Sequence, residues 1–171
     1  YKESGISLIR SLNIFDDGFR KGKLAFIDET QAEKLNNVTI EIGDVLLNIT
    51  GASVARCCIA PSECLPARVN QHVSIIRLKE DTMSSEFLHY LLIAKLNKDL
   101  LLGIGDQGAT RQAITKKQIE SFIISYPEGD KEQKQSTRLI NNLKNQILSL
   151  ESKYQQELNS LQELKKSILE K

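Results

Sequence analysis

The sequence lacks most of the patterns that catalysis, cofactor binding and membrane insertion require. It has two histidines, three cysteines and no tryptophan among its 171 residues. Neither a G-x-G-x-x-G pattern nor a P-loop occurs, and neither histidine stands beside a nucleophile motif. No apolar run approaches the ~20 residues of a membrane-spanning helix, and no signal segment opens the chain. We therefore expect a cytoplasmic protein that contacts no membrane and carries no catalytic residues and no cofactor of its own.

The sequence also has no marked excess of positive charge. Lys and Arg together number 23 against 22 for Asp and Glu, which gives a net charge of +1. A strongly basic chain would indicate binding to nucleic acid through its phosphates. This chain can therefore bind an anion only through a local patch of basic residues.

The cysteines do not form a metal-binding pattern. Cys57, Cys58 and Cys64 lack the paired C-x-x-C spacing of a structural zinc site, and His72 is the one nearby candidate for a fourth ligand. Adjacent cysteines in a strand would point to opposite faces. We expect reduced thiols that serve as small apolar residues and no metal site. His72 and His89 are expected to be a strand residue and a helix-face residue.

The C-terminal residues, 130–171, contain the strongest pattern in the sequence. Asp130, with Gln133 three residues later, predicts the start of a helix. Apolar residues then recur at alternating steps of three and four, which is the heptad spacing of a coiled-coil seam. The seam residues are Ile140, Leu143, Ile147, Leu150, Tyr154, Leu161, Leu164 and Ile168. Glu157 interrupts the series, and Leu158 beside it partly takes its place.

The length of this helix predicts a partner. At 1.5 Å per residue it would span about 60 Å, which is more than the rest of the chain could cover. Its apolar stripe must therefore meet another helix, and the sequence contains no second long one. We expect a homodimer, antiparallel through Ile140 to Ile168, because two-fold dimers are the commonest closed assembly.

The body that precedes this helix mixes strand and helix signals. Alternating or continuous apolar runs predict strands at 38–42, 45–49, 54–60, 69–78 and 122–124. The second and third would form a hairpin around the polar loop 50–53. A helix is expected from the serines at 84–85 to Gly103, and the capping box of Thr115 and Gln118 predicts a short helical turn. The predicted fold class is α+β: a mixed α/β body followed by a long, coiled-coil-forming helix.

A polar loop framed by glycines lies at 105–114, between the expected helix and the short turn. Glycine allows close approach of the backbone to a ligand. Thr110, Arg111 and Gln112 offer side chains that can reach base edges or phosphates. A flexible polar loop without such a role is the alternative, and composition alone favours it.

The order of these pieces resembles the specificity subunit of type I restriction-modification systems. The pieces cover nearly the whole chain, and their order and spacing carry the resemblance more than any one of them does. The matching stretches are GISLIR at 5–10, GDVLLNITG at 43–51, VNQHV at 69–73, FLHYL at 87–91, GATRQAI at 108–114, and the heptad helix.

The resemblance implies a DNA-reading function without catalysis. Residues 1–128 would be a target recognition domain that reads one half of a bipartite sequence in double-stranded DNA. Residues 129–171 would be the long helix of a conserved region that acts as a coiled-coil spacer. Modification subunits docked on it would carry S-adenosylmethionine and methylate adenine, and a restriction subunit would add ATP-driven translocation and cleavage.

The chain departs from this family in two ways. Recognition domains of the family begin with a further strand and loop upstream of the stretch matched at 5–10. The full-length subunit also has two recognition domains and two long helices, against one of each here. We therefore expect a fragment or a half-subunit.

The resemblance also indicates a contact surface on the body. Arg suits guanine, Asn and Gln suit adenine, and Lys more often holds phosphates. Gly51 and Gly108 look like framework turns. The expected DNA-binding residues are Arg10, Arg20, Lys21, Lys23, Asn48, Thr50, Ser53, Arg56, Gln71, Thr110, Arg111 and Gln112.

Two other functions remain open. The same module could be the DNA-specificity part of a single-chain restriction–methyltransferase enzyme, in which case a catalytic domain would precede it in the same frame. A coiled-coil adaptor without a DNA role would explain the helix alone, and it would show no salt-sensitive binding to a duplex.

Overall fold

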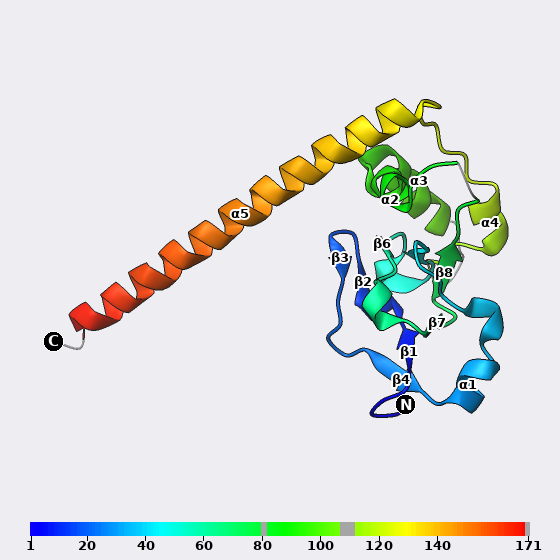
Figure 1. Ribbon diagram of the computed structural model, residues 1–171, viewed down its shortest axis with the longest axis horizontal. Coiled ribbons are helices and arrows are strands. Elements are labelled where there is room, and N and C mark those ends of the chain that lie inside the picture. The colour runs from blue at the N-terminus through cyan, green and yellow to red at the C-terminus, as the bar shows by residue number, and fades with distance from the viewer. Residues whose placement is uncertain (80–81, 107–111, 170–171) are drawn as a thin grey trace. The chain divides into compact units, whose positions relative to one another are not determined.

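A computed structural model describes residues 1–79, 82–106 and 112–169 of the chain. The chain divides into two compact units, residues 1–127 and residues 128–171. The first unit is a mixed α/β body and the second is a long helix, so the predicted α+β fold class is confirmed (Figure 1). Within the described residues, no helix combines the length and the apolar character needed to cross a membrane.

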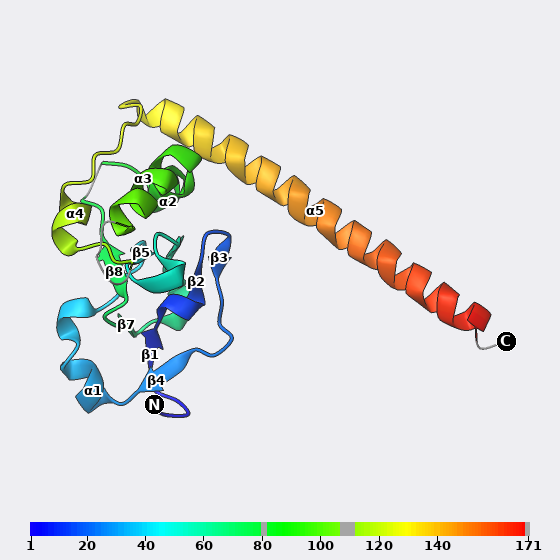
Figure 2. The same cartoon turned by 180° about the vertical axis from the view of Figure 1, so that it is seen from behind.

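One sheet of the body joins strands that are distant in the sequence. Its order is β4-β1-β7, and β1 runs antiparallel to β4 and parallel to β7. The strands are β1 (Ile6–Ile9), β4 (Ala25–Ile27) and β7 (Ala67–Val69). Helix α1 (Glu29–Glu33) follows β4 (Figure 2). The Asp28 carboxylate fixes its start by accepting a hydrogen bond from the Gln31 N–H at 2.9 Å, and this bond lowers the pKa of Asp28.

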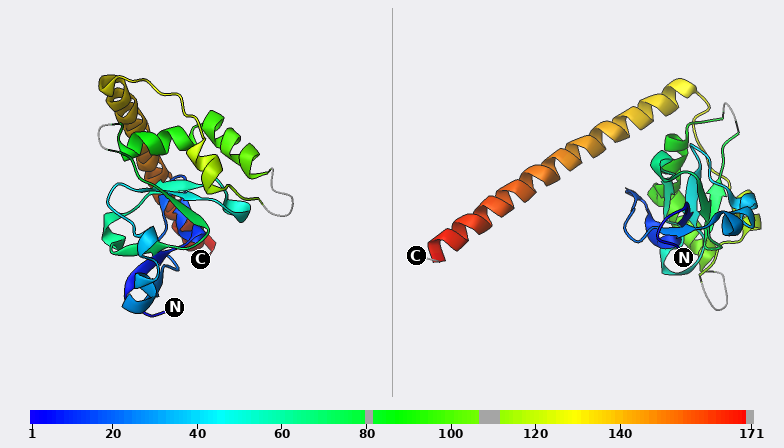
Figure 3. Two further views of the ribbon diagram at one scale, coloured as in Figure 1. Left: turned by 90° about the vertical axis from the view of Figure 1, so that its right-hand side faces the viewer. Right: turned by 60° about the horizontal axis from the view of Figure 1, so that its bottom comes forward.

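The second sheet has the order β6-β5-β8, and each strand runs antiparallel to its neighbour. It consists of β5 (Val45–Asn48), β6 (Cys57–Ile59) and β8 (Val73–Ile76), and it is followed by α2 (Ser85–Ile93) and α3 (Lys95–Gly105). Val45 lies opposite Ile59, which confirms the predicted hairpin pairing. Figure 3 shows α2 and α3 on one side of these strands. A short hairpin, β2 (Ile14–Phe15) with β3 (Gly18–Phe19), packs against β6.

Strand β5 is buried on both faces and is shared by two hydrophobic clusters. Leu46 belongs to a cluster with residues of β1, β7 and β8. Val45 and Leu47 point the other way, into a cluster completed by α2 and α3. All three side chains have no exposed surface, and burial of a leucine contributes about 1.5–3 kcal/mol. The near-continuous apolar run at 45–49 is the sequence signal of this double burial.

The adjacent cysteines follow the same alternation. Cys57 lies in the cluster of Val45 and Leu47, and Cys58 lies in the cluster of Leu46, as expected for neighbours in a strand. Burial raises the pKa of each thiol to about 12. Both groups are therefore neutral and apolar in character at physiological pH.

The predicted strand at 38–42 is wrong. Residues Asn36–Val38 form a 3-10 turn, and Thr39 makes a single bridge to Arg68. The apolar residues that suggested a strand do not share one buried face, because Ile40 is buried while Ile42 is 80% exposed. A turn from Glu41 to Asp44 replaces the expected ladder.

Two long predicted elements are each divided in two. The run 69–78 begins at the last residue of β7 and includes β8, and these two strands belong to different sheets. The Val73 N–H closes the turn between them on the Asn70 carbonyl at 3.1 Å. The helix predicted from 84–85 to Gly103 breaks at Ala94, whose ψ is 136°. The Asn97 side chain donates to the Leu91 carbonyl at 2.9 Å and satisfies the end of α2. The break changes which residues are buried: Leu96 and Leu100, which continue the apolar period of α2, are 75% and 50% exposed, whereas Leu101 packs in the same cluster as Leu88 and Leu92.

Some shorter elements begin at other residues than the sequence predicts. Strand β6 begins three residues later than Val54, because Ala55 adopts a left-handed φ of +65°. Residues 122–124 are not a strand, although Phe122 and Ile124 pack on the core. The Thr115 capping box is confirmed at α4 (Lys116–Glu120). In α5 (Asp130–Leu169), Asp130 is the first helical residue rather than a cap.

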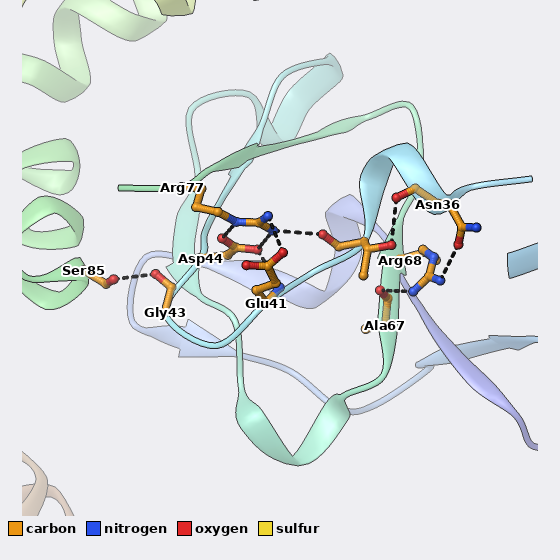
Figure 4. Close-up of polar contacts among 9 residues, drawn as sticks. Asn36, Glu41, Gly43, Asp44, Ala67, Arg68, Arg77 and Ser85 are labelled. Atoms are coloured by element: carbon orange, nitrogen blue, oxygen red, sulfur yellow. Dashed lines mark hydrogen bonds and ion pairs between the residues drawn. The ribbon is translucent and has the colours of Figure 1, made fainter. Parts of the chain in front are cut away.

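An ion pair fixes the start of β5 to the end of β8 (Figure 4). The Arg77 guanidinium donates to both carboxylate oxygens of Asp44, at 2.8 and 2.7 Å, and also to Glu41 and to the Thr39 carbonyl. The Asp44 side chain is only 1% exposed, whereas that of Arg77 is 45% exposed. The hydrogen bonds to Asp44 raise the pKa of Arg77, so the guanidinium stays charged at every pH of interest.

We predict that Arg77→Ala lowers the free energy of unfolding by about 3 kcal/mol, the lower end for a broken buried pair, because it leaves the Asp44 carboxylate buried without its counter-ion. Urea denaturation would measure the loss. Lys95→Ala is the matched control: it removes an exposed pair with Asp99, and should cost about 0.5 kcal/mol or less. Equal losses for the two variants would contradict the role assigned to Arg77.

We also predict that Cys57 and Cys58 resist alkylation in the folded protein. With a pKa of about 12, roughly one thiol in ten thousand is ionised at pH 8, and neither side chain is accessible. Iodoacetamide followed by mass spectrometry should leave both unmodified until urea is added. Rapid modification of either residue in the native protein would show that the strand opens or that the thiol is activated.

Candidate functional site

Main-chain hydrogen bonds join the two loops that the sequence singled out. The segment after β5 runs beside residues 112–114: the Ile114 N–H donates to the Ile49 carbonyl at 2.8 Å, and the Gly51 N–H donates to the Gln112 carbonyl at 2.9 Å. Thr50 and Ala113 form an antiparallel bridge between these bonds. Because β6 begins only at Cys57, the polar loop predicted at 50–53 extends to Arg56, and this loop at 50–56 forms one surface with the end of the glycine-framed loop.

Gly51 allows this junction to form. Its φ is +71°, in the left-handed region that favours glycine, and the 3-10 turn Gly51–Ser53 starts there. The role of a framework turn expected for Gly51 fits this geometry. Gly108, the other expected framework glycine, lies outside the described residues.

A concave surface of about 650 Å³ lies over the junction. Its lining comes from the two loops, the β2–β3 hairpin, the turn before that hairpin and the turn before β8. The lining residues are Ser11, Leu12, Phe15, Thr50, Gly51, Ala52, Ser53, Arg56, His72, Gln112 and Ala113. A second hollow of about 730 Å³, lined in part by Arg10 and Gln71, shares Ser11, Leu12 and His72 with the first. The two hollows therefore adjoin.

His72 and Thr50 join the two hollows. The Thr50 hydroxyl and His72 Nδ1 lie 2.7 Å apart, and the Ile49 N–H donates to the His72 carbonyl at 3.0 Å. Asn48, by contrast, has no exposed surface, and its amide donates to the Ser11 carbonyl at 2.9 Å. Asn48 therefore lies beneath the surface as a support and is corrected from an expected DNA contact to a structural residue.

The basic side chains of the surface differ in their partners. Arg20 pairs with Asp17, and Lys21 lies 3.2 Å from Glu63. A hydrogen bond from the Glu63 backbone and the contact with Lys21 lower the pKa of the Glu63 carboxyl. For Arg56, no acidic partner occurs among the described residues; its guanidinium lies over the Phe15 ring, 5.0 Å from the centroid.

Arg10 and Lys23, like Arg56, are expected DNA-binding residues that form no ion pair with a carboxylate of the described part of the chain. Arg10 donates to the Lys23 carbonyl at 2.6 Å and stacks on Tyr1, with 5.0 Å to the ring centroid. Lys23 is exposed and has a left-handed φ of +64°. An unpaired cation does not have to give up an ion pair before it binds an anion, so Arg10, Lys23 and Arg56 are the side chains best prepared to do so.

Of the remaining expected residues, several lie at this surface. Thr50, Ser53 and Gln112 line the first hollow, and Gln71 is exposed at the second. The Gln112 amide donates to Asp106 at 2.6 Å. Thr110 and Arg111 lie outside the described residues.

Sequence reasoning missed four residues that build this site. Phe15 and His72 line the first hollow, and Asp16 and Lys98 form an ion pair, with 2.8 Å between nitrogen and oxygen. Asp16 and Lys98 lie 82 residues apart, so no local pattern links them. Phe15 carries a weak signal, because it is an aromatic residue directly before two acidic residues.

The polar groups of the surface are of the kind that serve recognition. No cluster of His, Cys, Asp or Glu that could hold a metal occurs in the part of the chain that the structure describes. The neutral, buried thiols of Cys57 and Cys58 cannot act as nucleophiles. What the surface presents is cations, amides and hydroxyls around a shallow apolar floor, which suits hydrogen bonding to a polyanion with polar edges.

The predicted seam of the long helix is exposed within this chain. Its eight side chains range from 36% exposed at Ile140 to 68% at Tyr154. They follow one stripe of α5, a single uninterrupted helix of 40 residues. A helix with this much exposed apolar surface has the character of an association element.

Comparisons with known proteins found a family and a fold that the chain resembles. A family model described as "Type I restriction modification DNA specificity domain" matches residues 10–160. A solved structure, described as the structural basis underlying complex assembly and conformational transition of the type I R-M system, contains a chain of similar fold, with a TM-score of 0.62 and 19% sequence identity. The match covers 88% of this chain and 33% of the other, so this chain spans about a third of that length. No curated protein matches.

Proposed function

The chain belongs to the family of type I restriction modification DNA specificity domains, and on this premise we propose that its body reads one half of a bipartite sequence in duplex DNA. The observation that carries the proposal is the junction of the loops at 50–56 and 112–114, by which Arg56, without an acidic partner among the described residues, and Gln112 line one concave surface. A guanidinium suits guanine O6 and N7, and an amide suits adenine N6 and N7.

The adjoining hollow would hold the DNA backbone. Arg10 and Lys23, which have no acidic partner among the described residues, would contact phosphates and set the register of the duplex. This division of labour is compatible with a net charge of +1, because sequence discrimination needs few side chains. Partner subunits would supply the remaining phosphate contacts.

The chemistry would reside on those partners. We place S-adenosylmethionine on modification subunits docked to this chain and ATP-driven cleavage on a restriction subunit, as the family resemblance implies, and the described residues form no group of His, Cys, Asp or Glu that could hold a metal. The chain itself would be non-catalytic. The body would recognise the DNA target, and the long helix would set the distance between recognition domains.

We predict that Arg56→Ala weakens binding to the cognate duplex by about 1–3 kcal/mol and binding to scrambled DNA much less, if Arg56 contacts a base. If it contacts only a phosphate, both affinities should fall equally and the salt slope should shrink by roughly one. The assay is fluorescence-detected titration of the complex with its modification subunit over a salt series. The cognate duplex is first selected from a randomised pool by the unaltered protein.

Lys95→Ala serves as the control for this titration, because it removes one positive charge from α3 and its side chain is engaged with Asp99. It should leave affinity and specificity unchanged. Unchanged binding for Arg56→Ala, Arg111→Ala and Gln112→Ala together would remove these loops from the recognition surface. If the intact protein shows no salt-sensitive binding to duplex DNA, a role as a coiled-coil adaptor is favoured.

A second prediction concerns the long helix. We propose an antiparallel homodimer through Ile140 to Ile168, because the seam is exposed along α5 and two copies would bury each other's stripes. Sedimentation at tens of micromolar should show a dimer. Replacing Leu143, Leu150 and Leu161 together with Glu should give a monomer.

The matched control places the same charges on the opposite side of the helix. Asn145→Glu, Ser152→Glu and Asn159→Glu add three carboxylates outside the seam, so this variant should remain dimeric. A monomer at these concentrations for the unaltered chain, or a dimer that survives the seam changes, would contradict the proposed association.

A further inference from the structure

Arg56 follows a residue in an unusual backbone conformation. Ala55 has a φ of +65°, in the left-handed region that residues with a Cβ rarely adopt, and its surface is fully buried. The Ala55 N–H donates to the Asn48 carbonyl at 2.8 Å, and the Asn48 N–H donates to the Arg56 carbonyl at 2.8 Å. The main chain on both sides of the Ala55–Arg56 peptide is therefore bound to the last residue of β5.

A second group of contacts holds the same turn from α3 and the β2–β3 hairpin. The Lys98 ammonium donates to both carboxylate oxygens of Asp16, each at 2.8 Å, and also to the Ala55 carbonyl. Asp16 also accepts a hydrogen bond from the Cys57 N–H at 3.1 Å. The Lys98 side chain is only 18% exposed, so solvent screens these interactions weakly. Asp16 and Lys98 thus fix the residues that precede and follow Arg56.

The side chain of Arg56 is held as well as its backbone. Its guanidinium carbon lies 5.0 Å from the centroid of the Phe15 ring, and Phe15 directly precedes Asp16 in the hairpin. The guanidinium of Arg20 lies 5.1 Å from the same centroid, but Arg20 is paired with Asp17. A guanidinium stacked on an aromatic ring keeps its N–H edges free for hydrogen bonds.

We propose that Phe15 is a positioning residue for Arg56: it acts on DNA specificity through the stacked guanidinium, with the Asp16–Lys98 pair holding the turn beneath. The inference rests on the proposed function and deepens it. A free arginine loses much rotamer freedom when it binds, and a stacked one has lost part of that freedom already. The structure therefore presents a pre-organised reading group rather than a flexible cation.

A direct role for Phe15 is the competing explanation. The ring lines the hollow, so it could contact a base by itself, or it could simply stabilise the hairpin. These roles differ in one respect. If Phe15 acts through Arg56, its replacement has no further effect on DNA binding once Arg56 has been removed.

A double-mutant cycle tests this difference. Phe15→Leu, which keeps the apolar bulk but removes the ring face, is combined with Arg56→Ala, and Phe15→Tyr serves as the conservative variant. Each protein, with its modification subunit, is titrated with the selected cognate duplex and with its scrambled form. Thermal unfolding of each variant is recorded alongside, so that a loss of folded protein is separated from a loss of specificity.

We expect Phe15→Leu to lower the preference for cognate over scrambled DNA by about 2- to 10-fold in the original background, and to have no such effect in the Arg56→Ala background. Phe15→Tyr should retain the preference. An effect of Phe15→Leu that persists without Arg56, or no effect in a folded variant that still depends on Arg56, would overturn the positioning role.

Two further outcomes keep the inference separate from the proposed function. If Arg56→Ala leaves the preference unchanged, Arg56 reads no base and the positioning role of Phe15 is overturned, whereas the proposed reading surface fails only if Arg56→Ala, Arg111→Ala and Gln112→Ala together leave DNA binding unchanged. A second cycle with Arg20→Ala provides the matched control, because the Arg20 guanidinium lies 5.1 Å from the centroid of the same ring, against 5.0 Å for Arg56. Coupling of Phe15 to Arg20 but not to Arg56 would also overturn the proposal.

Discussion

The bidentate ion pair between Arg77 and Asp44 is the interaction on which the rest of the body depends. Asp44 immediately precedes β5 and Arg77 immediately follows β8, so the pair fixes the relative register of the two strands. The Ala60 N–H donates to the Asp44 carbonyl at 2.8 Å, which adds the end of β6 to the same point. With three strands fixed at one end, their other ends are fixed too. That is where Asn48, Arg56 and His72 lie.

The candidate surface is therefore built on ends of strands, and the rigidity comes from what lies under them. Both faces of β5 are packed, by Leu46 on one and by Val45 and Leu47 on the other, so the strand cannot shift without opening two clusters. Asn48 lies where this apolar packing ends. There the strand is held by hydrogen bonds between Asn48 and Ser11, Ala55 and Arg56.

Sequence was informative where a signal is local. The heptads predict α5, the apolar run predicts β5, and Thr115 predicts α4, because each depends on spacing within a few residues. The β4-β1-β7 sheet joins residues from distant parts of the chain and was not predicted. At the site, the polar residues of the two loops could be named from sequence. Their support could not, because Lys98 reaches Asp16 across 82 residues and Phe15 gains its role only from the guanidinium above it.

The bond between the two loops uses main-chain atoms alone, and this has a consequence for how such a surface can diversify. The Gly51 N–H and the Gln112 carbonyl hold the junction, and neither depends on the side chains of Ala52, Ser53 or Gln112. New side chains at these exposed or half-exposed positions can change the pattern of donors and acceptors without altering the framework. A surface of this kind can acquire a different target by a few substitutions while its fold stability stays nearly constant.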